Sequence, residues 1–149
     1  MVSLNPFAEF RESCQTALKN ALKRLFPEIF VLILLESPPS PEFGELSSSI
    51  CFELAKQTGK KPITVVKQVA KAIDLSVFPL VQEIKAAGDG YINFYVKLAQ
   101  LSKLTIESVR TLDADYGCIK AEKPTKIIVE HTSVNPIHPI NVGQARNPV

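Results

Sequence analysis

The turn sequence Gly88-Asp89-Gly90 separates two β-prone apolar runs and constrains the fold more than any other feature of the chain. The run before it reads LVQEIKAA, and the run after it reads YINFYVK. A short glycine-containing turn between two such runs is typical of a β-hairpin, whose strands are antiparallel. The chain is therefore predicted to contain an antiparallel sheet.

Several other segments have the apolar spacing of helices that bury one face. The first has Asn5 in the N-cap position and Pro6 in its first turn, and Pro27 ends it. Gly59 closes the second, as glycine often does at a helix C-terminus. The predicted helical ranges are 6–26, 47–59, 62–73 and 98–112.

The run IFVLILLE, residues 29–36, is short, apolar and β-prone, and it is predicted to form a buried strand. The proline-rich stretch after it, residues 37–46, is predicted to be an irregular loop. Helices and antiparallel strands together give an α+β fold for residues 1–112, with an antiparallel sheet packed with helices.

The composition changes after residue 112. Residues 113–125 are polar and charged, contain Gly117 and Pro124, and are predicted to be a linker. The sequence KIIVEHTS then predicts a strand, followed by a loop that leads toward a helix start. Residues 126–149 are therefore expected to be the truncated start of a second domain.

Apolar residues make up 46% of the 149 residues, which is enough for a buried core, and the net charge is only +2. With so little net charge, a nucleic-acid footprint would have to be local. A solvated helix face would show the same pattern of charge. The candidate residues are Lys56, Lys60, Lys61, Lys67 and Lys71.

The sequence argues against a membrane protein and against a metal site. No apolar run is long enough to cross a bilayer, and the N-terminus does not resemble a signal peptide. Cys14, Cys51 and Cys118 are widely spaced and odd in number, which indicates a reduced, cytoplasmic chain. His131 and His138 do not have metal-ligand spacing either.

The C-terminal stretch VEHTSVNPIHPINVGQARN has a strand, a loop with Gly143 and a helix start, the geometry that places phosphates on helix amides. Gly143 lets a ligand approach the backbone closely, and Arg146 adds a cation. This pattern is common, and on spacing alone a simple strand-to-helix connection is favoured.

That stretch, residues 129–147, resembles the signature of class I arginine–tRNA ligases, Val-Glu-x-x-Ser-x-Asn-Pro followed by His-x-Gly-His-x-Arg-Asn. Three upstream segments resemble the same family in the same order: PEFGELSSSICFELAK, KKPITVVKQVAKAI and GDGYINFYV. The resemblance covers nearly the whole chain. It implies an N-terminal additional domain that contacts tRNA near the D-loop, and then the start of a Rossmann-type catalytic domain.

The resemblance also implies roles for individual residues. A carboxylate suits the arginine substrate because charge-assisted pairs are strong, and an aromatic ring with an amide suits an unstacked RNA base. Without the resemblance, Tyr91 would be read as a strand aromatic packed on a neighbour. The implied positions are Glu130, Ser133 and Asn135 for arginine, Asn141, Gly143 and Gln144 for ATP, and Tyr91 and Asn93 for tRNA.

The chain departs from the family pattern at both signature histidines, which are replaced by Asn141 and Gln144. Losing one donor to a transition state typically costs roughly 3–4 kcal/mol, so we expect fast adenylation to be lost even where binding survives. Pro148 stands where the family continues into a helix, a position that is awkward for proline.

A Rossmann site uses the ends of several strands, and one strand cannot form it. The 149 residues alone are therefore expected to lack a complete catalytic site and to take no cofactor, whereas the full-length family enzyme uses ATP and arginine. The expected partner is arginine-specific tRNA, not DNA or a membrane. The open alternatives are the N-terminal part of an arginine–tRNA ligase, a stand-alone tRNA-binding or protein-docking module, and a decayed paralogue.

Overall fold

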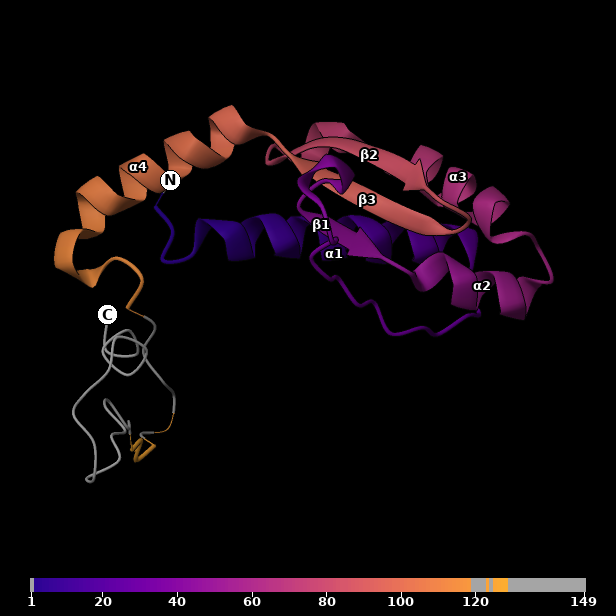
Figure 1. The fold of residues 1–149 in the computed structure, drawn as a ribbon, viewed down its shortest axis with the longest axis horizontal. Helices are drawn as coiled ribbons and strands as arrows, with labels where there is room; N and C mark the ends of the chain where they lie inside the picture. Colours follow the sequence, from indigo (N-terminus) through magenta and orange to yellow (C-terminus); the bar gives the residue numbers. More distant parts are fainter. Residues whose placement is uncertain (1, 119–122, 124, 129–149) are drawn as a thin grey trace, which may run out of the picture. The chain divides into compact units, whose positions relative to one another are not determined.

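The computed structural model describes residues 2–118, 123 and 125–128 of the chain. The chain divides into two compact units, Met1–Cys118 and Ile119–Val149. The helices and strands of the described residues all lie in the first unit, which is drawn in Figure 1. The predicted boundaries at residues 112 and 125 stay predictions.

The described part of the chain contains four α-helices close to the predicted ranges: α1 (Pro6–Leu25), α2 (Ile50–Thr58), α3 (Pro62–Ala72) and α4 (Leu98–Leu112). The side chain of Asn5 caps α1 by accepting a 3.0 Å hydrogen bond from the Ala8 N–H. Gly59 ends α2 in the left-handed conformation, with φ of 67°. The capping signals at Asn5 and Gly59 therefore predicted the start of α1 and the end of α2 correctly, whereas α2 begins at Ile50, later than the predicted residue 47.

The sheet contains β1 (Leu46–Ser48), β2 (Val81–Ala87) and β3 (Tyr91–Val96) in the order β1-β3-β2, and both pairs are antiparallel (Figure 1). Ala87 pairs with Tyr91 across the predicted turn, which confirms the hairpin. β1 was not predicted, because its serines resemble the start of the helix that follows. The α+β class of residues 2–118 is confirmed.

The sheet has one face packed on the helices. Alternate residues of β3, Ile92, Phe94 and Val96, are buried, and α1, α2 and α3 contact the sheet. Burying a side chain of this size contributes about 1.5–3 kcal/mol. The core from the helices includes Phe10, Cys14, Leu18, Leu54, Val65, Val66 and Val69.

The prediction of a buried strand at residues 29–36 is wrong. Only Glu36 pairs with the sheet, through two hydrogen bonds of 2.9 and 2.8 Å with Ser47. Continuing this antiparallel register would place Leu34 opposite Ser49. The chain has by then turned into α2, so in the described structure the residues before Glu36 form no backbone strand pairing, and Leu34 contacts β1 through the 2.7 Å hydrogen bond that Ser48 Oγ donates to its carbonyl.

Residues 29–35 are instead a segment whose side chains alternate in burial. Ile29, Val31, Ile33 and Leu35 pack against the core. Their neighbours point outward: Phe30 is 93% exposed, Leu32 79% and Leu34 56%. The period-2 pattern typical of a strand is therefore present, but the pairing is not.

The helix α4 is joined to the N-terminus of the chain. The Ser3 N–H donates a 2.8 Å hydrogen bond to Ser108 Oγ, whose hydroxyl donates to the Leu104 carbonyl at 2.6 Å. Leu104 and Ser108 are buried, whereas Ile106 and Val109 on the predicted apolar face are exposed. This helix therefore buries less of its apolar face than its spacing predicts.

The three cysteines are free. Cys14 and Cys51 are buried in the core, and Cys118 is exposed. Desolvation by burial raises the pKa of Cys14 and that of Cys51 from 9.0 to about 12. Both buried thiols are therefore protonated at neutral pH. In the described residues, no helix has the length and apolarity needed to cross a membrane.

Candidate nucleic-acid interface

A groove of about 430 Å³ lies on the face of the sheet away from the helical core. Its floor includes Asn93 of β3 and Ser47 of β1, and Tyr91 stands beside the hairpin turn. The residues 36–39 and Phe43 form its other side. The structure therefore brings together Tyr91 and Asn93, the two residues predicted to contact tRNA.

Asn93 is held in one orientation by the neighbouring strand. Its side chain is only 2% exposed, and Asn93 Oδ1 accepts a 2.7 Å hydrogen bond from Ser47 Oγ. Ser47 is also its partner in the β1–β3 register. Because Asn93 lines the groove and its oxygen is engaged, Nδ2 is the amide atom left to donate toward a ligand.

The strand register places Asn93 in a row of polar residues that crosses the sheet. Glu36 pairs with Ser47, Ser47 with Asn93, and Asn93 with Lys85. Side chains at paired positions share one face of a sheet, so the row offers an acid, a hydroxyl, an amide and a cation in order. Such a row can contact the polar edge of a planar ligand.

Tyr91 presents an aromatic ring beside this row, two residues before Asn93 along β3. It is 47% exposed, and its ring meets that of Phe52 edge to face, with centroids 5.2 Å apart and an interplanar angle of 75°. The contact with Phe52 fixes the ring while much of its surface stays open. Tyr91 is thus both packed on a neighbour and available for stacking.

Gly90 determines how closely the hairpin turn approaches the helices. A Cβ at this position would lie 2.8 Å from the Phe52 ring and 2.8 Å from Pro62 Cβ. Only glycine lets the turn reach α2 and the start of α3. The position of Tyr91, the next residue, depends on this contact.

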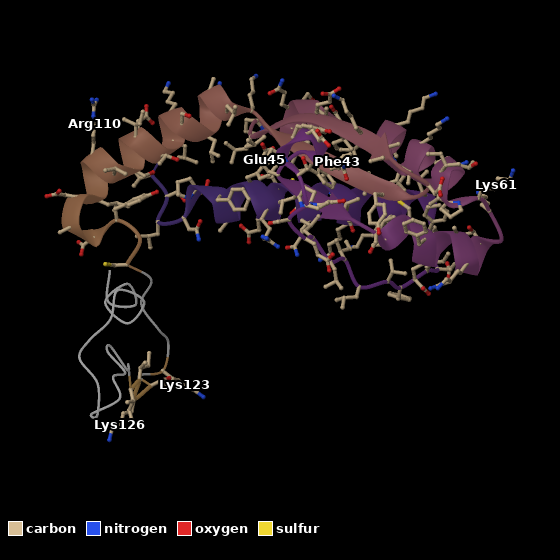
Figure 2. The ribbon with its side chains drawn as sticks, in the orientation of Figure 1. Phe43, Glu45, Lys61, Arg110, Lys123 and Lys126 are labelled. Carbon is tan, nitrogen blue, oxygen red and sulfur yellow. The ribbon has the colours of Figure 1, made fainter. Side chains whose placement is uncertain are left out.

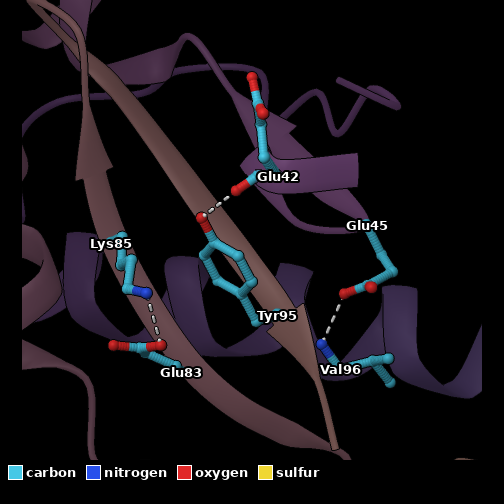
Figure 3. Close-up of polar contacts among 6 residues, drawn as sticks. All are labelled: Glu42, Glu45, Glu83, Lys85, Tyr95 and Val96. Carbon is cyan, nitrogen blue, oxygen red and sulfur yellow. Dashed lines mark hydrogen bonds and ion pairs between the residues drawn. The ribbon is translucent and has the colours of Figure 1, made fainter. Parts of the chain in front are cut away.

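A set of polar contacts holds the opposite wall of the groove (Figure 3). The Tyr95 hydroxyl donates to the Glu42 carbonyl at 3.0 Å, and the Val96 N–H donates to Glu45 Oε2 at 2.7 Å. Gly44, between the two glutamates, has φ of 83°, and a Cβ there would lie 2.5 Å from the Phe94 carbonyl oxygen. These contacts fix the short 3₁₀ helix Pro41–Phe43, which carries Phe43 to the groove.

Lys85, at the β2 end of the row, is held as a cation. Its ammonium lies 2.9 Å from Glu83 Oε2 and 4.7 Å from the centroid of the Tyr95 ring. The hydrogen bond with Glu83 raises the pKa of Lys85. Lys85 is therefore charged at neutral pH, although its charge is partly balanced by Glu83.

Lysines lie on α2, on α3 and on the connection between these two helices. The five predicted lysines are exposed, and Lys61 extends from the connection between α2 and α3 (Figure 2). The chain from Leu54 to Ile73 contains no acidic residue. The local positive charge that the sequence predicted is therefore present on α2, α3 and their connection.

Comparison with known proteins decides the family. The model of the arginyl tRNA synthetase N terminal domain matches residues 12–96, which run from α1 to the end of β3. The chain belongs to the arginyl-tRNA synthetase N-terminal domain family. The matched range includes every residue of the groove described above.

Relatives of this family align over most of the chain. The chain is 31% identical over 139 residues to an arginine–tRNA ligase of Pyrococcus furiosus, covering 93% of this chain and 22% of the relative. It is 36% identical over 117 residues to that of Thermococcus sibiricus, covering 78% of this chain and 18% of the relative. The chain therefore spans about a fifth of the length of these relatives.

Two solved structures of arginyl-tRNA synthetases also match the chain. The arginyl-tRNA synthetase of Thermus thermophilus matches with a TM-score of 0.53 and 28% identity, covering 92% of this chain and 21% of that one. The synthetase of Plasmodium falciparum matches with a TM-score of 0.55 at 15% identity, covering 62% of this chain and 17% of that one, which shows the fold alone.

The arginine and ATP positions are implied by the family resemblance alone. They lie outside the described residues, and their roles stay predictions: Glu130, Ser133, Asn135, Asn141, Gly143 and Gln144.

Sequence reasoning missed Ser47 and Phe52, which orient the two predicted residues. Phe52 carries a usable signal, because it is an aromatic residue near the start of an amphipathic helix. Ser47 carries none, since its role depends on a strand pairing between residues 46 positions apart.

Proposed function

We propose that residues 2–118 bind tRNA by taking one unstacked nucleobase into the groove between Tyr91 and Asn93. The observation that carries the proposal is the pair of fixed groups: a half-exposed ring held by Phe52 and a buried amide held by Ser47. Preset groups of this kind bind a ligand without a large ordering cost. Membership of the synthetase family supports tRNA as the RNA.

The chemistry of the groove fits a base better than a helix of RNA. A flat base stacks on the Tyr91 ring, which is worth about 1–3 kcal/mol per base by alanine substitution. Asn93 Nδ2 donates to a carbonyl oxygen or ring nitrogen on the edge of that base. Unstacked bases occur in loops, and the family resemblance implies that the loop contacted here is the D-loop, in the elbow of tRNA.

In a larger context, we infer that this module serves an arginine–tRNA ligase, which attaches arginine to its tRNA with ATP during protein synthesis in the cytoplasm. Glu130, Ser133 and Asn135 would then contact arginine, and Asn141, Gly143 and Gln144 would contact ATP. A Rossmann site needs several strands. The 149 residues by themselves are therefore expected to give no arginine-dependent ATP–pyrophosphate exchange, and measurable exchange would overturn this inference.

The experiment that tests the RNA site measures affinity for labelled arginine-specific tRNA by fluorescence anisotropy. Tyr91→Ala should lose about 5- to 150-fold in affinity, which corresponds to the loss of one stacking contact. Tyr91→Phe keeps the ring and should stay near wild type. Tyr116→Ala removes a tyrosine outside the groove and is the control. Unchanged binding by a folded Tyr91→Ala variant would show that this groove is not the RNA site.

The alternative function is a protein-docking module, and the exposed row Phe30, Leu32 and Leu34 favours it. The partner in that case is a full-length arginine–tRNA ligase. A pull-down of the purified ligase without RNA, which fails when Leu32 is changed to Lys, would support docking. Absence of capture would leave tRNA binding as the function.

A further inference from the structure

A second concave surface lies where the C-terminal ends of α1 and α3 meet. It has a volume of about 360 Å³ and is lined by Leu25, Phe26, Lys60, Gln68, Lys71 and Ala72. Two ammonium groups and one amide surround an apolar floor. Among the described residues, no carboxylate lines this surface, which we call the Lys60–Lys71 pocket.

The two lysines are positioned by the fold. Lys60 Nζ lies 5.8 Å from the centroid of the Phe26 ring, within the range of a cation–π contact. Lys71 is in the last turn of α3, where the helix dipole favours a positive charge. The Arg24 guanidinium donates to the Ala72 carbonyl and so joins the end of α1 to the end of α3.

The acidic group that follows α3 is already engaged. Asp74 Oδ1 accepts hydrogen bonds from the Ser76 N–H at 3.0 Å and from the Ser76 hydroxyl at 2.7 Å. These bonds, with the Arg24 charge as a smaller cause, lower the pKa of Asp74. Among the described residues, neither Lys60 nor Lys71 forms an ion pair with a carboxylate, so their charge is available to a ligand.

We propose that the Lys60–Lys71 pocket binds a phosphate of the RNA backbone. Two ammonium groups complement the charge of a phosphate, and the amide of Gln68 adds a neutral donor for an oxygen. The floor of Leu25, Phe26 and Ala72 suits the apolar side of a ribose. The inference rests on the proposed function for its partner, but it assigns a site separate from the base groove.

The fold places this pocket so that one RNA can reach both sites. Gly90, beside Tyr91, packs against Phe52 of α2 and Pro62, the first residue of α3, so the hairpin turn lies next to the connection between these helices. That connection carries Lys60 and Lys61, and Figures 1 and 2 show Lys61 at the end of the unit where the β2–β3 turn lies. A backbone that leaves the base groove therefore meets lysines on its way to the pocket.

The test compares the 149-residue chain with the double variant Lys60→Gln/Lys71→Gln. Association constants for labelled tRNA are measured by anisotropy over a series of salt concentrations. Loss of one phosphate contact should lower the slope of log K against log salt by about 0.7–0.9 in magnitude. The loss should be equal for arginine-specific and unrelated tRNA, because a phosphate carries no sequence information.

Two further variants test whether the contact depends on the pocket itself or on positive charge anywhere on the surface. Lys19→Gln/Lys97→Gln removes the same charge from exposed lysines outside the pocket and should leave the slope near wild type. Lys60→Arg/Lys71→Arg keeps the charge and should restore most of the affinity. An equal loss in the Lys19 and Lys97 variant would overturn the proposal, as would an unchanged slope in the Lys60 and Lys71 variant.

A site for free phosphate is distinguished from a site for the RNA backbone by two titrations, one with inorganic phosphate and one with tRNA. In both, the chemical shift of the Gln68 side-chain amide is followed by NMR. The proposal expects tRNA to shift this signal at concentrations where inorganic phosphate does not. The reverse result would make the pocket a free-phosphate site and overturn the RNA assignment.

If Tyr91→Ala still weakens tRNA binding while the lysine variants do not, the assignment of the Lys60–Lys71 pocket is wrong and the proposed function stands. The opposite pattern would retain the pocket and reject the base groove.

Discussion

The Ser47 hydroxyl donates a 2.7 Å hydrogen bond to Asn93 Oδ1 across the β1–β3 pair. Strand β1 contains only Leu46–Ser48, yet this bond gives it a role in the base groove. It joins a residue that sequence reasoning missed to one that the sequence singled out. Removing it tests whether orientation of the amide matters.

Ser47→Ala should weaken tRNA binding about 3- to 10-fold and lower the free energy of unfolding by about 1 kcal/mol, the usual worth of one hydrogen bond. Without the hydroxyl, the Asn93 amide loses the contact that fixes which of its atoms faces the groove. Anisotropy and urea unfolding measure the two effects. Ser49→Ala, at an exposed position of the same groove, is the matched control. Wild-type affinity in Ser47→Ala would contradict the role given to this bond.

Gly90→Ala should destabilise the unit by about 1–3 kcal/mol, because the new methyl group would overlap Phe52 and Pro62. Urea unfolding gives this cost. Gly88→Asn is the comparison: Gly88 has φ of 51°, but a Cβ there meets only Tyr91 Cδ2 at 3.9 Å, and asparagine tolerates that conformation. Equal stability of the two variants would show that the close approach at Gly90 is not required.

Cys14 should make the unit sensitive to alkaline pH. Its folded pKa of about 12 lies above the ordinary value of 9.0, so the folded state keeps a proton that the unfolded state releases. The stability from the buried neutral thiol is complete below pH 9 and is lost as pH rises toward 12, at about 1.4 kcal/mol per pH unit. Cys51 acts in the same direction.

Cys14→Ala removes this titration. The variant should be less stable than wild type at pH 8, because it leaves a small cavity, and the difference should shrink as pH rises above 9. Urea unfolding of both proteins at successive pH values measures the difference between their free energies of unfolding. Because the other groups titrate in both proteins, their contributions cancel in this difference. A difference that stays constant to pH 11 would contradict the assignment.

Leu32→Lys and Leu35→Ala distinguish the two sides of residues 29–35. Leu32 is 79% exposed, so a lysine there should change the free energy of unfolding by less than about 0.5 kcal/mol. Leu35 is 7% exposed and belongs to the core, so its truncation should cost about 2–4 kcal/mol. Thermal or urea unfolding measures both. A similar large cost for both would mean that residues 29–35 are buried on both sides, as the sequence first indicated.

Local signals predicted much of the fold. Asn5, Gly59 and Pro62 mark helix ends through backbone chemistry that acts within one turn, and Gly88 permits the tight hairpin. Strand pairing is not local. Residues 29–36 have the composition of a buried strand, but whether they pair depends on where β1 ends and α2 begins.

The candidate site also contains both kinds of residue: some that local signals locate in the sequence, and some that only strand pairing brings to the site. Tyr91 and Asn93 were found through a family motif on a strand that the hairpin signal already located. Ser47 and Glu36 reach the site only through register, and a shift of one residue would turn both to the other face. The polar row could therefore not be predicted before the sheet was known.

The stretch Ile29–Leu35 contains no charge, proline or glycine, and much of its outer row is open to water. Segments of this kind add strands from other chains and grow into fibrils. The bond from Arg11 to the Leu35 carbonyl, at 2.8 Å, helps hold the stretch on the core. Conditions that loosen α1 would therefore weaken the hold on an aggregation-prone segment, and a charged side chain in its outer row should oppose pairing with strands of other chains.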